Sequence, residues 1–310
     1  MKTSLAVAAC LSLIALPAVA APRPAITGVS HIAVYAADMA KTEHFYVHDL
    51  GTTKGVDPEN PAGVRYYVSP AQFIEVLPLP ATEADPKNRL DHVAFATTDA
   101  EGLRAYMASK NITVPAHVSK GNDGSSWFDT IDPEGNRVEF VQAPAKLPDV
   151  PLNPLSSHII HVGYIIHNRA LEDSFYRDVL GFRPYWYGGP GKAPTPEWIS
   201  QQVPDGTDWI EYMVQKPIDG KGIPPQMSQA VAGILDHFSL GVADIKATDT
   251  TLWTGGRLEG QDPNNGPKIG ADAKWQLNLY DPDGTRAEIM EFHAIGTPCC
   301  SPFTAKDPEK

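Results

Sequence analysis

One stretch of sequence occurs twice and sets the plan of the chain: residues 131–141 read IDPEGNRVEFV and residues 280–290 read YDPDGTRAEIM. Each copy opens with Asp-Pro-acid-Gly, in which Asp starts a turn, Pro fixes φ at the second position and Gly suits the fourth. A strand-like segment follows, with Glu139 in the middle of the first copy and Glu288 in the middle of the second. Residues two apart on a strand share a face. Each carboxylate is therefore either a rim charge paired with the Arg two residues before it or a metal ligand.

Outward from these stretches, the chain repeats one plan of strand, helix and three strands. None of these units is large enough to fold well alone, so we expect them to pair into two domains, residues 26–142 and 158–294. The segment between them, residues 143–157, carries four prolines and is predicted to be a linker. The four units cover residues 26–80, 85–142, 156–216 and 232–294.

Local patterns assign elements within the first two units. Residues 39–50 and 101–110 are predicted helices, and Gly51 suits the C-cap of the first. Residues 64–77 are predicted to form a hairpin and residues 112–118 a strand. The first helix ends with Phe-Tyr at residues 45–46 and Leu-Gly at residues 50–51. The second half has the same two pairs at the same spacing, at residues 175–176 and 180–181.

Residues 1–20 are typical of a secretory signal peptide. Lys2 gives a basic start, residues 5–17 are apolar, and residues 18–20 read AVA, the small-x-small form of a cleavage site. We expect cleavage before Ala21 and a periplasmic or secreted protein. Loss of Lys2, the one charged residue of this segment, changes the formal net charge from −12 to −13. Such an acidic chain is a poor ligand for nucleic acid and for anionic membranes.

Two cysteines, Cys299 and Cys300, remain after the expected cleavage, and they are adjacent in the predicted C-terminal tail, residues 295–310. Two cysteines are no disulfide framework, so the fold must rest on its apolar cores. The pair suits either a frayed tail or an intermolecular disulfide or redox role.

Each of the four units places one His on its first strand and one Glu on its last strand, 44, 47, 50 and 51 residues apart. If paired units curve into one open sheet, these strands line the same concave face, and each domain gathers two His and two Glu. Two neutral imidazoles and two carboxylates suit divalent Fe, Mn, Co, Ni or Zn. We therefore predict two metal sites, with the second favoured if only one binds metal. The predicted ligands are His31, Glu75, His92, Glu139, His161, Glu211, His237 and Glu288.

The motifs that carry a family resemblance are DHVAF at residues 91–95 and DPEGNRVEF at residues 132–140, with their echoes in the second half. In these the sequence resembles the vicinal oxygen chelate superfamily, which includes glyoxalase I, extradiol dioxygenases, methylmalonyl-CoA epimerase, and fosfomycin and bleomycin resistance proteins. The resemblance covers nearly all of the mature chain. It implies an α+β fold of four βαβββ modules paired into two open-barrel domains.

The resemblance implies several chemistries. Bacterial glyoxalase I takes a His and a Glu from each of two modules as metal ligands, a pattern that both halves match. Extradiol dioxygenases use two His and one Glu of the second half, which leaves Glu211 as a departure. Their usual signature also places two residues between Tyr and the turn, whereas Tyr280 directly precedes Asp281 here.

We therefore expect an exported metal enzyme that chelates two neighbouring oxygens of a small substrate, with lyase or isomerase chemistry like that of glyoxalase. A ligand carboxylate, Glu139 or Glu288, would act as the base. The alternatives are Fe(II)-dependent ring cleavage of a catechol, and a metal-free module that binds a drug or metabolite. A homodimer is possible.

Two further groups of residues have open roles. His44 and His48 stand four apart on the predicted helix 39–50, which suits either a metal site or a solvated face. Seven aromatic residues of the second half either line a pocket for an apolar substrate or belong to the core. These are Tyr164, Tyr185, Trp186, Tyr187, Trp198, Trp209 and Trp275.

Overall fold

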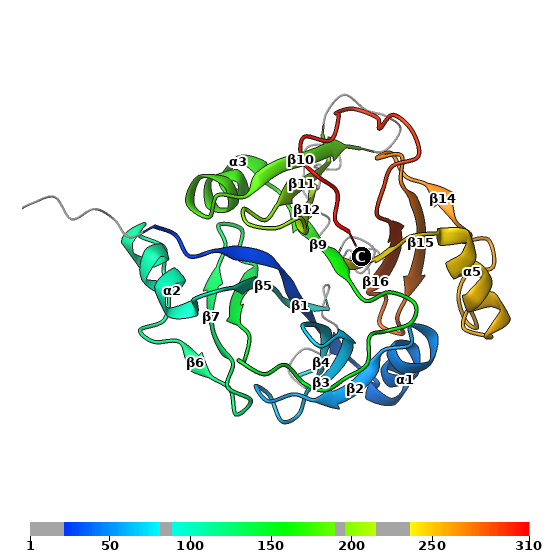
Figure 1. The fold of residues 1–310 in the computed structure, drawn as a ribbon, viewed down its shortest axis with the longest axis horizontal. Helices are drawn as coiled ribbons and strands as arrows, with labels where there is room; N and C mark the ends of the chain where they lie inside the picture. The colour runs from blue at the N-terminus through cyan, green and yellow to red at the C-terminus, as the bar shows by residue number, and fades with distance from the viewer. Residues whose placement is uncertain (1–21, 81–88, 190–195, 215–235, 310) are drawn as a thin grey trace, which may run out of the picture.

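The computed structural model describes residues 22–80, 89–189, 196–214 and 236–309, and it forms two curled eight-stranded sheets with the helices on their outer sides (Figure 1). The predicted signal peptide, residues 1–20, lies outside the described residues. No helix in the described part of the chain is long and apolar enough to cross a membrane.

The first sheet has the strand order β2-β3-β4-β1-β5-β8-β7-β6. Its centre is β1, which pairs parallel with β4 and antiparallel with β5. The two modules therefore meet along β1 and β5, as expected of paired units. The strands are β1 (Ile26–Ala36), β2 (Thr53–Val56), β3 (Val64–Ser69), β4 (Gln72–Pro78), β5 (Leu90–Thr97), β6 (Ser119–Lys120), β7 (Ser126–Ile131) and β8 (Arg137–Gln142).

The second sheet repeats this topology in the order β10-β11-β12-β9-β13-β16-β15-β14. Here β9 is central, parallel to β12 and antiparallel to β13. The predicted α+β class and the four βαβββ modules are confirmed. The strands are β9 (Ile159–Ile166), β10 (Arg183–Gly188), β11 (Trp198–Gln202), β12 (Trp209–Val214), β13 (His237–Val242), β14 (Lys268–Ile269), β15 (Trp275–Tyr280) and β16 (Arg286–Glu291).

Each first helix of a domain ends in a π-helical turn, which the sequence pattern had merged into one helix. In the first domain α1 (Met39–Glu43) leads into η1 (His44–Asp49), and in the second α3 (Arg169–Asp173) leads into η2 (Ser174–Val179). The other two helices of the described residues, α2 (Ala100–Ser109) and α5 (Ile245–Thr254), are regular and begin after Asp N-caps.

The predicted strand at residues 112–118 is wrong. These residues form a loop, and only Ser119–Lys120 pair with β7. Pro115 lies in the middle of the segment and has no N–H to give to a ladder, so it interrupts strand pairing. The apolar Ile112 and Val114 still pack partly against the core, which explains the misleading pattern.

The repeated Asp-Pro-acid-Gly turns tie the two domains together reciprocally. Asp132 of the first turn accepts a hydrogen bond from the hydroxyl of Tyr164 in the second domain, at 3.1 Å. Asp281 of the second turn accepts a hydrogen bond from the hydroxyl of Tyr46 in the first domain, at 3.2 Å. All four side chains are buried. Each turn therefore serves the other domain as well as its own strand.

The acid at the third position of each turn makes a second bridge. Glu134 accepts hydrogen bonds from the backbone N–H groups of His167 and Asn168, just before α3. In the same way Asp283 accepts from the N–H of Ala37, just before α1, at 3.0 Å. A carboxylate beside a helix N-terminus is stabilised by the unpaired N–H groups and the helix dipole. The motif thus fixes the helix of the opposite domain.

Candidate metal centres

In the first domain the strand register places small residues between the predicted ligands. Ala33 on β1 pairs with Glu75 on β4 and with His92 on β5. Ala94 on β5 pairs with the histidine of β1 and with Glu139 on β8. Ala33 and Ala94 each carry only a methyl group between the larger side chains. The two imidazoles and two carboxylates can therefore approach one another over the face of the sheet.

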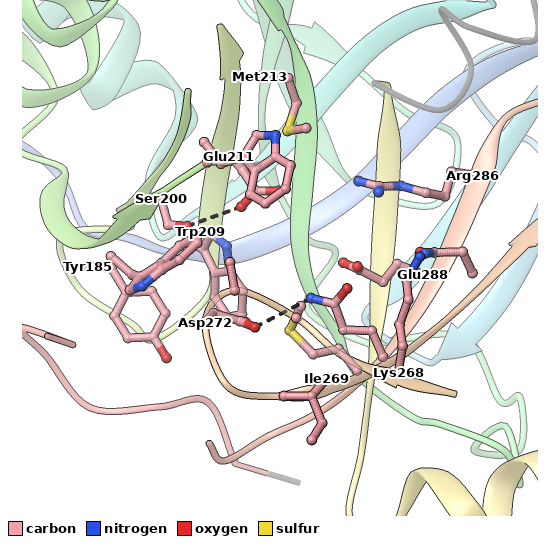
Figure 2. Close-up of a pocket in the computed structure, with 18 of the residues that line it drawn as sticks. Tyr185, Ser200, Trp209, Glu211, Met213, Lys268, Ile269, Asp272, Arg286 and Glu288 are labelled. Atoms are coloured by element: carbon pink, nitrogen blue, oxygen red, sulfur yellow. Dashed lines mark hydrogen bonds between the residues drawn. The ribbon is translucent and has the colours of Figure 1, made fainter. Parts of the chain in front are cut away.

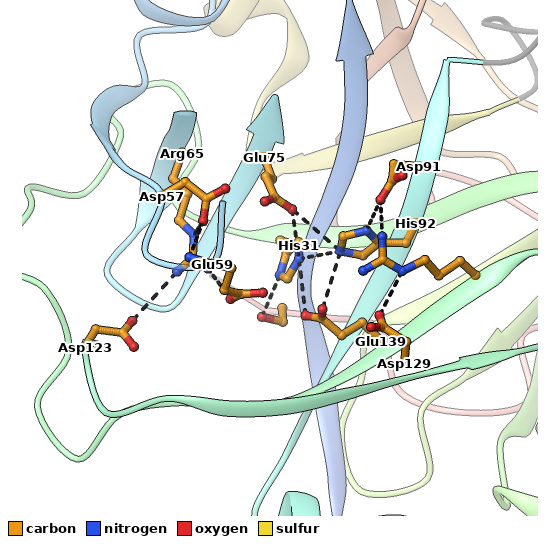
Figure 3. A network of polar contacts seen from close by, with 12 residues as sticks. His31, Asp57, Glu59, Arg65, Glu75, Asp91, His92, Asp123, Asp129 and Glu139 are labelled. Carbon is orange, nitrogen blue, oxygen red and sulfur yellow. Dashed lines mark hydrogen bonds and ion pairs between the residues drawn. The ribbon is translucent and has the colours of Figure 1, made fainter. Parts of the chain in front are cut away.

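The four donor groups of the first set converge, as Figure 3 shows. Nε2 of His31 lies 2.9 Å from Nε2 of His92. Carboxylate oxygens of Glu75 and Glu139 lie 3.7 and 3.6 Å from Nε2 of His31, and 3.7 and 3.9 Å from Nε2 of His92. The structure therefore brings all four predicted residues of this domain into one cluster.

Neighbouring groups hold both imidazoles in orientation. Nδ1 of His92 lies 2.7 Å from a carboxylate oxygen of Asp91, which Arg137 also contacts at 2.6 Å. Nδ1 of His31 lies 3.2 Å from Oγ of Ser30. Such outer partners leave Nε2 of each ring to face the centre, as metal-binding histidines require.

The carboxylates of the first set lack the partners that buried charges need. Both oxygens of Glu139 and one of Glu75 have no hydrogen-bond partner among the described residues. Burial, with Asp57 adding to it, raises the pKa of Glu75 to about 10, and burial raises that of Glu139 well above its usual range. Burial and His92 lower the pKa of His31, which keeps this imidazole neutral. Without a cation these two acids keep their protons; two imidazole nitrogens and two buried carboxyl groups are donors that a divalent cation would bind in exchange for those protons.

The second domain gathers its own four predicted ligands in the same way. Nε2 of His161 lies 3.0 Å from Nε2 of His237. Glu288 lies 3.2 Å from the first ring and Glu211 3.4 Å from the second. Gly163 takes the place of Ala33 in the register, between Glu211 and His237.

The second set differs from the first in its electrostatics. Although burial opposes ionisation, Arg286 and His161 hold the pKa of Glu288 at about 2. Burial likewise opposes ionisation of Glu211, and His237 lowers its pKa. Both carboxylates of this set are therefore ionised at neutral pH and ready to bind a cation.

A cavity of about 500 Å³ opens onto the second set, and both Glu211 and Glu288 reach its wall (Figure 2). Aromatic side chains cover one side, whereas Ser200, Asn278 and Arg286 add polar groups. Lys268, Asp272 and Gln276 also line the cavity. A concave site that combines aromatic side chains with polar groups suits a small organic ligand.

The seven aromatic residues singled out from the sequence divide between pocket and core. Tyr185, Trp186, Trp198 and Trp209 line the cavity. The ring of Trp209 also stacks on the imidazole of His161, with ring centroids 4.5 Å apart. Three do not line it: Tyr164 lies in the core between the domains, Tyr187 is partly exposed, and Trp275 packs against the core.

The first set opens onto a cavity of about 200 Å³, which Glu75 and His92 reach and which Glu59, Asp91 and Arg137 also line. Arg65 lies over the ring of Phe73 and pairs with Glu59 and Asp57 in the same network (Figure 3). Glu139 itself is fully buried. The first set is therefore enclosed by charged side chains and has little room for a substrate.

The C-terminal tail packs on the second domain and completes its pocket. Phe303 lines the cavity. Lys274, fully buried, donates to Asp307 at 2.9 Å and to the hydroxyl of Tyr185 at 3.0 Å. The ammonium group also lies 5.0 Å from the centre of the Phe303 ring. The buried ammonium group of Lys274 thus holds the tail against the second domain.

The adjacent cysteines lie in this anchored segment. Cys299 and Cys300 form a disulfide with each other. The backbone N–H of Cys299 donates to the carbonyl of Ala271 in the pocket wall, and its carbonyl accepts from the Trp186 indole. The interpretation of the tail as frayed is wrong for these residues, because they are hydrogen-bonded to the pocket.

Comparison with known proteins gives structural matches alone. No protein-family model and no curated protein matches the sequence. The 2,3-dioxygenase LapB from Pseudomonas sp. KL28 matches with a TM-score of 0.61 at 15% identity, over 87% of this chain and 93% of LapB. The Mn(II)-bound glyoxalase from Novosphingobium aromaticivorans matches with a TM-score of 0.65 at 16% identity, over 86% and 83% of the two chains. A homoprotocatechuate 2,3-dioxygenase variant from B. fuscum gives 0.63 at 19%, over 88% and 73%.

The chain has the vicinal oxygen chelate fold. Within this fold, the ligand positions followed from the repeat, but three other features of the sites did not. Arg286 was visible as the strand neighbour of Glu288, yet its place on the pocket wall needed the curl of the sheet. Arg65 pairs with Glu75 across the predicted hairpin of residues 64–77, but no pattern showed that its side chain encloses the first set, and none linked Phe303 of the tail to the second pocket.

Proposed function

We propose that this chain is a metal-dependent enzyme whose active centre is the second set, His161, Glu211, His237 and Glu288. The observation that carries the proposal is the cavity of about 500 Å³ that reaches two of these ligands. In the first domain the cavity beside the predicted ligands is about 200 Å³, and Glu139 does not line it. The substrate would be a small organic molecule with two neighbouring oxygens, and the reaction an isomerisation or lyase step beside a carbonyl group.

The second set has the donors that a divalent Fe, Mn, Co, Ni or Zn ion prefers. Nε2 of His161 faces the cluster, 3.0 Å from Nε2 of His237 and 3.2 Å from a carboxylate oxygen of Glu288. A bound metal would supply a Lewis acid for charge that develops on the substrate oxygens. The Mn(II)-bound glyoxalase among the matching structures supports the same type of centre.

The presence of Glu211 favours isomerase or lyase chemistry over oxygenation. Three protein ligands leave three positions of an octahedron, enough for two substrate oxygens and O₂. A fourth ligand leaves two positions, which two substrate oxygens fill. Glu211 lies 3.4 Å from His237 and reaches the cavity, so it is placed to be that fourth ligand.

Glu288 is placed to move the proton. Its carboxylate would take the proton from the hydroxyl-bearing carbon beside the carbonyl, and the electron pair of that C–H bond would move toward the carbonyl oxygen to give an enediolate. Return of this proton to the former carbonyl carbon, with transfer of the hydroxyl proton to the former carbonyl oxygen, turns the hydroxyl into the new carbonyl and completes an isomerisation without any oxidant or reductant. Arg286 lines the same cavity and would stabilise the negative oxygen. The aromatic wall would exclude water from the reacting carbon.

The test separates the three chemistries with metal-loaded full-length mature protein. We expect incorporation of solvent deuterium beside the carbonyl of α-hydroxy carbonyl compounds or thiol hemithioacetals, abolished in Glu288→Gln and by chelation. The matched variant Glu139→Gln should retain the exchange. O₂ uptake with a catechol and Fe(II) would instead show a dioxygenase. Ligand binding that survives chelation, with no exchange, would show a binding protein.

We also propose that the protein is exported, on the basis of residues 1–20. The N-terminal sequence of the protein from cells that express the full gene tests this: Ala21 as the first residue supports export, and an intact Met1 contradicts it. Association into a homodimer stays a prediction.

A further inference from the structure

A third cluster of metal-ligating side chains lies outside both central sets, on the π-helical turn η1. It consists of His44, His48 and Asp49, whose ligand atoms all lie within 4.8 Å of one another. Nδ1 of His48 is 2.7 Å and Nε2 of His44 3.8 Å from the same oxygen of Asp49. The two imidazole rings are stacked with centroids 4.6 Å apart. Three donors thus meet at one point on the surface.

The π-helical turn explains how these three residues meet. The N–H of Leu50 donates to the carbonyl of Phe45, five residues back. In such a turn, side chains four and five residues apart lie on the same side. The residues between them, Phe45 and Tyr46, bury their rings in the core and fix the turn. The ligand side is therefore rigid at its base and open at its tip.

The second domain shows that the fold does not need these side chains. Its turn η2 has the same Phe-Tyr to Leu-Gly spacing and the same five-residue hydrogen bond, from Leu180 to Phe175. The residues that correspond to the cluster are Ser174, Asp178 and Val179. One turn of a repeated pair thus carries a His-His-Asp set that the other lacks, so the set serves something other than the turn itself.

The surroundings favour a cation. A cavity of about 520 Å³ between the domains is lined by Lys41, His44 and Asp49 on one side and by Glu259, Asp262 and Asp281 on the other, so its carboxylates outnumber its one lysine. The side chain of Asp49 is 7% exposed, whereas those of His44 and His48 are 63% and 48% exposed. A buried carboxylate with two accessible imidazoles gives an ion from solution a direct approach.

We propose that His44, His48 and Asp49 bind a divalent transition-metal ion, of the Zn²⁺, Ni²⁺ or Cu²⁺ type, at the junction of the two domains. Two imidazole nitrogens and one carboxylate oxygen are the donors that these ions prefer. The site joins the domains, because the carbonyl of His48 accepts a hydrogen bond from Arg257 of the second domain at 3.0 Å. A bound ion would stabilise the folded chain by mass action.

Equilibrium dialysis of the full mature protein against Zn²⁺ tests this site. The double variant His44→Gln, His48→Gln should bind one equivalent fewer than the unchanged protein and lose part of the rise in melting temperature that Zn²⁺ causes. The single variant His48→Gln should bind the same ion at least tenfold more weakly. The exposed His117 gives a matched control, because His117→Gln should retain every equivalent.

Equal numbers of bound Zn²⁺ in the double variant and the unchanged protein would overturn the proposal, as would the same loss in His117→Gln. The outcome does not depend on the central sets. If those sets bind no metal, the total falls equally in all these proteins and the difference of one equivalent remains. The double variant leaves the ligands of the second set in place and should retain any deuterium exchange.

Discussion

The hydroxyl of Tyr46 donates to the carboxylate of Asp281, 235 residues further along the chain, at 3.2 Å and with both groups buried. The mirrored bond joins Tyr164 to Asp132. The repeated turn therefore has a role beyond starting a strand, because it fixes the two domains to each other.

Loss of one of these bonds should weaken the whole protein. Tyr46→Phe removes the hydroxyl and leaves the buried Asp281 with fewer partners, so the free energy of unfolding should fall by about 1–3 kcal/mol. Urea denaturation measures this. The control is Tyr106→Phe, whose hydroxyl binds a partly buried carbonyl and should cost about 1 kcal/mol or less. Equal losses in the two variants would contradict the role of the turn.

A pH-dependent contact lies beside the same domain junction. Nε2 of His158 is 2.8 Å from Asp208, which also accepts from the N–H of Val29 in the first domain. Although burial opposes it, Asp208 raises the pKa of His158. The protonated form is therefore favoured in the folded state, and its stabilisation is full below about pH 6.5 and is lost as pH rises through the raised pKa.

The variant His158→Gln tests the direction in which this contact changes stability with pH. It should be less stable than the unchanged protein by about 1–2 kcal/mol near pH 6, and the difference should shrink toward pH 9. Urea denaturation at a series of pH values gives the difference directly. A difference that grows with pH would show that the pair stabilises the neutral imidazole instead.

Gly163 should be required by the second metal set. A methyl group at this position would lie 2.2 Å from Cε1 of the His237 ring, closer than atoms can approach. Gly163→Ala should therefore displace His237 and lower the metal affinity of the second set at least tenfold, with the first set unaffected. Isothermal titration with Mn²⁺ measures this. The first domain has Ala33 at the corresponding place, so an unchanged affinity would mean that His237 relaxes to the arrangement seen there.

The buried ammonium of Lys274 should hold the tail against the pocket. Lys274→Met removes its bonds to Asp307, to Tyr185 and to the carbonyl of Phe292. Because Asp307 is 22% exposed, the cost should be about 1–3 kcal/mol, below that of a fully buried pair. Hydrogen exchange of residues 299–307 should accelerate in this variant. Unchanged protection of the tail would show that the aromatic packing of Phe303 is sufficient.

The sequence allowed the fold and the convergence of the candidate ligands to be predicted for one physical reason. Strand residues alternate with period two, and the chain repeats its plan, so His31 and His161 or Glu139 and Glu288 had to occupy equivalent places. Because all four units bury the same strand pattern, equivalent positions can be recognised from the sequence alone.

The remaining features depend on side-chain contacts that strand periodicity does not encode. Arg65 pairs with Glu75 in the predicted hairpin, yet no pattern shows its ion pairs with Asp57 and Glu59, and none shows that Phe303 completes the second pocket. The segment around Pro115 shows the opposite failure, since its apolar residues pack against the core without strand pairing. Local apolar patterns report burial, and they do not report which backbone partner is present.

The most direct test of the account is the metal content of the mature protein and of two matched double variants. His237→Ala with Glu288→Gln removes half of the second set, and His92→Ala with Glu139→Gln removes the same half of the first. After loading with Mn²⁺ and removal of excess metal, elemental analysis should show the loss of about one equivalent in the first double variant, together with loss of deuterium exchange. The second double variant should keep the exchange. Unchanged metal content in the His237 and Glu288 variant would contradict the central claim that the second set is the metal centre of this protein.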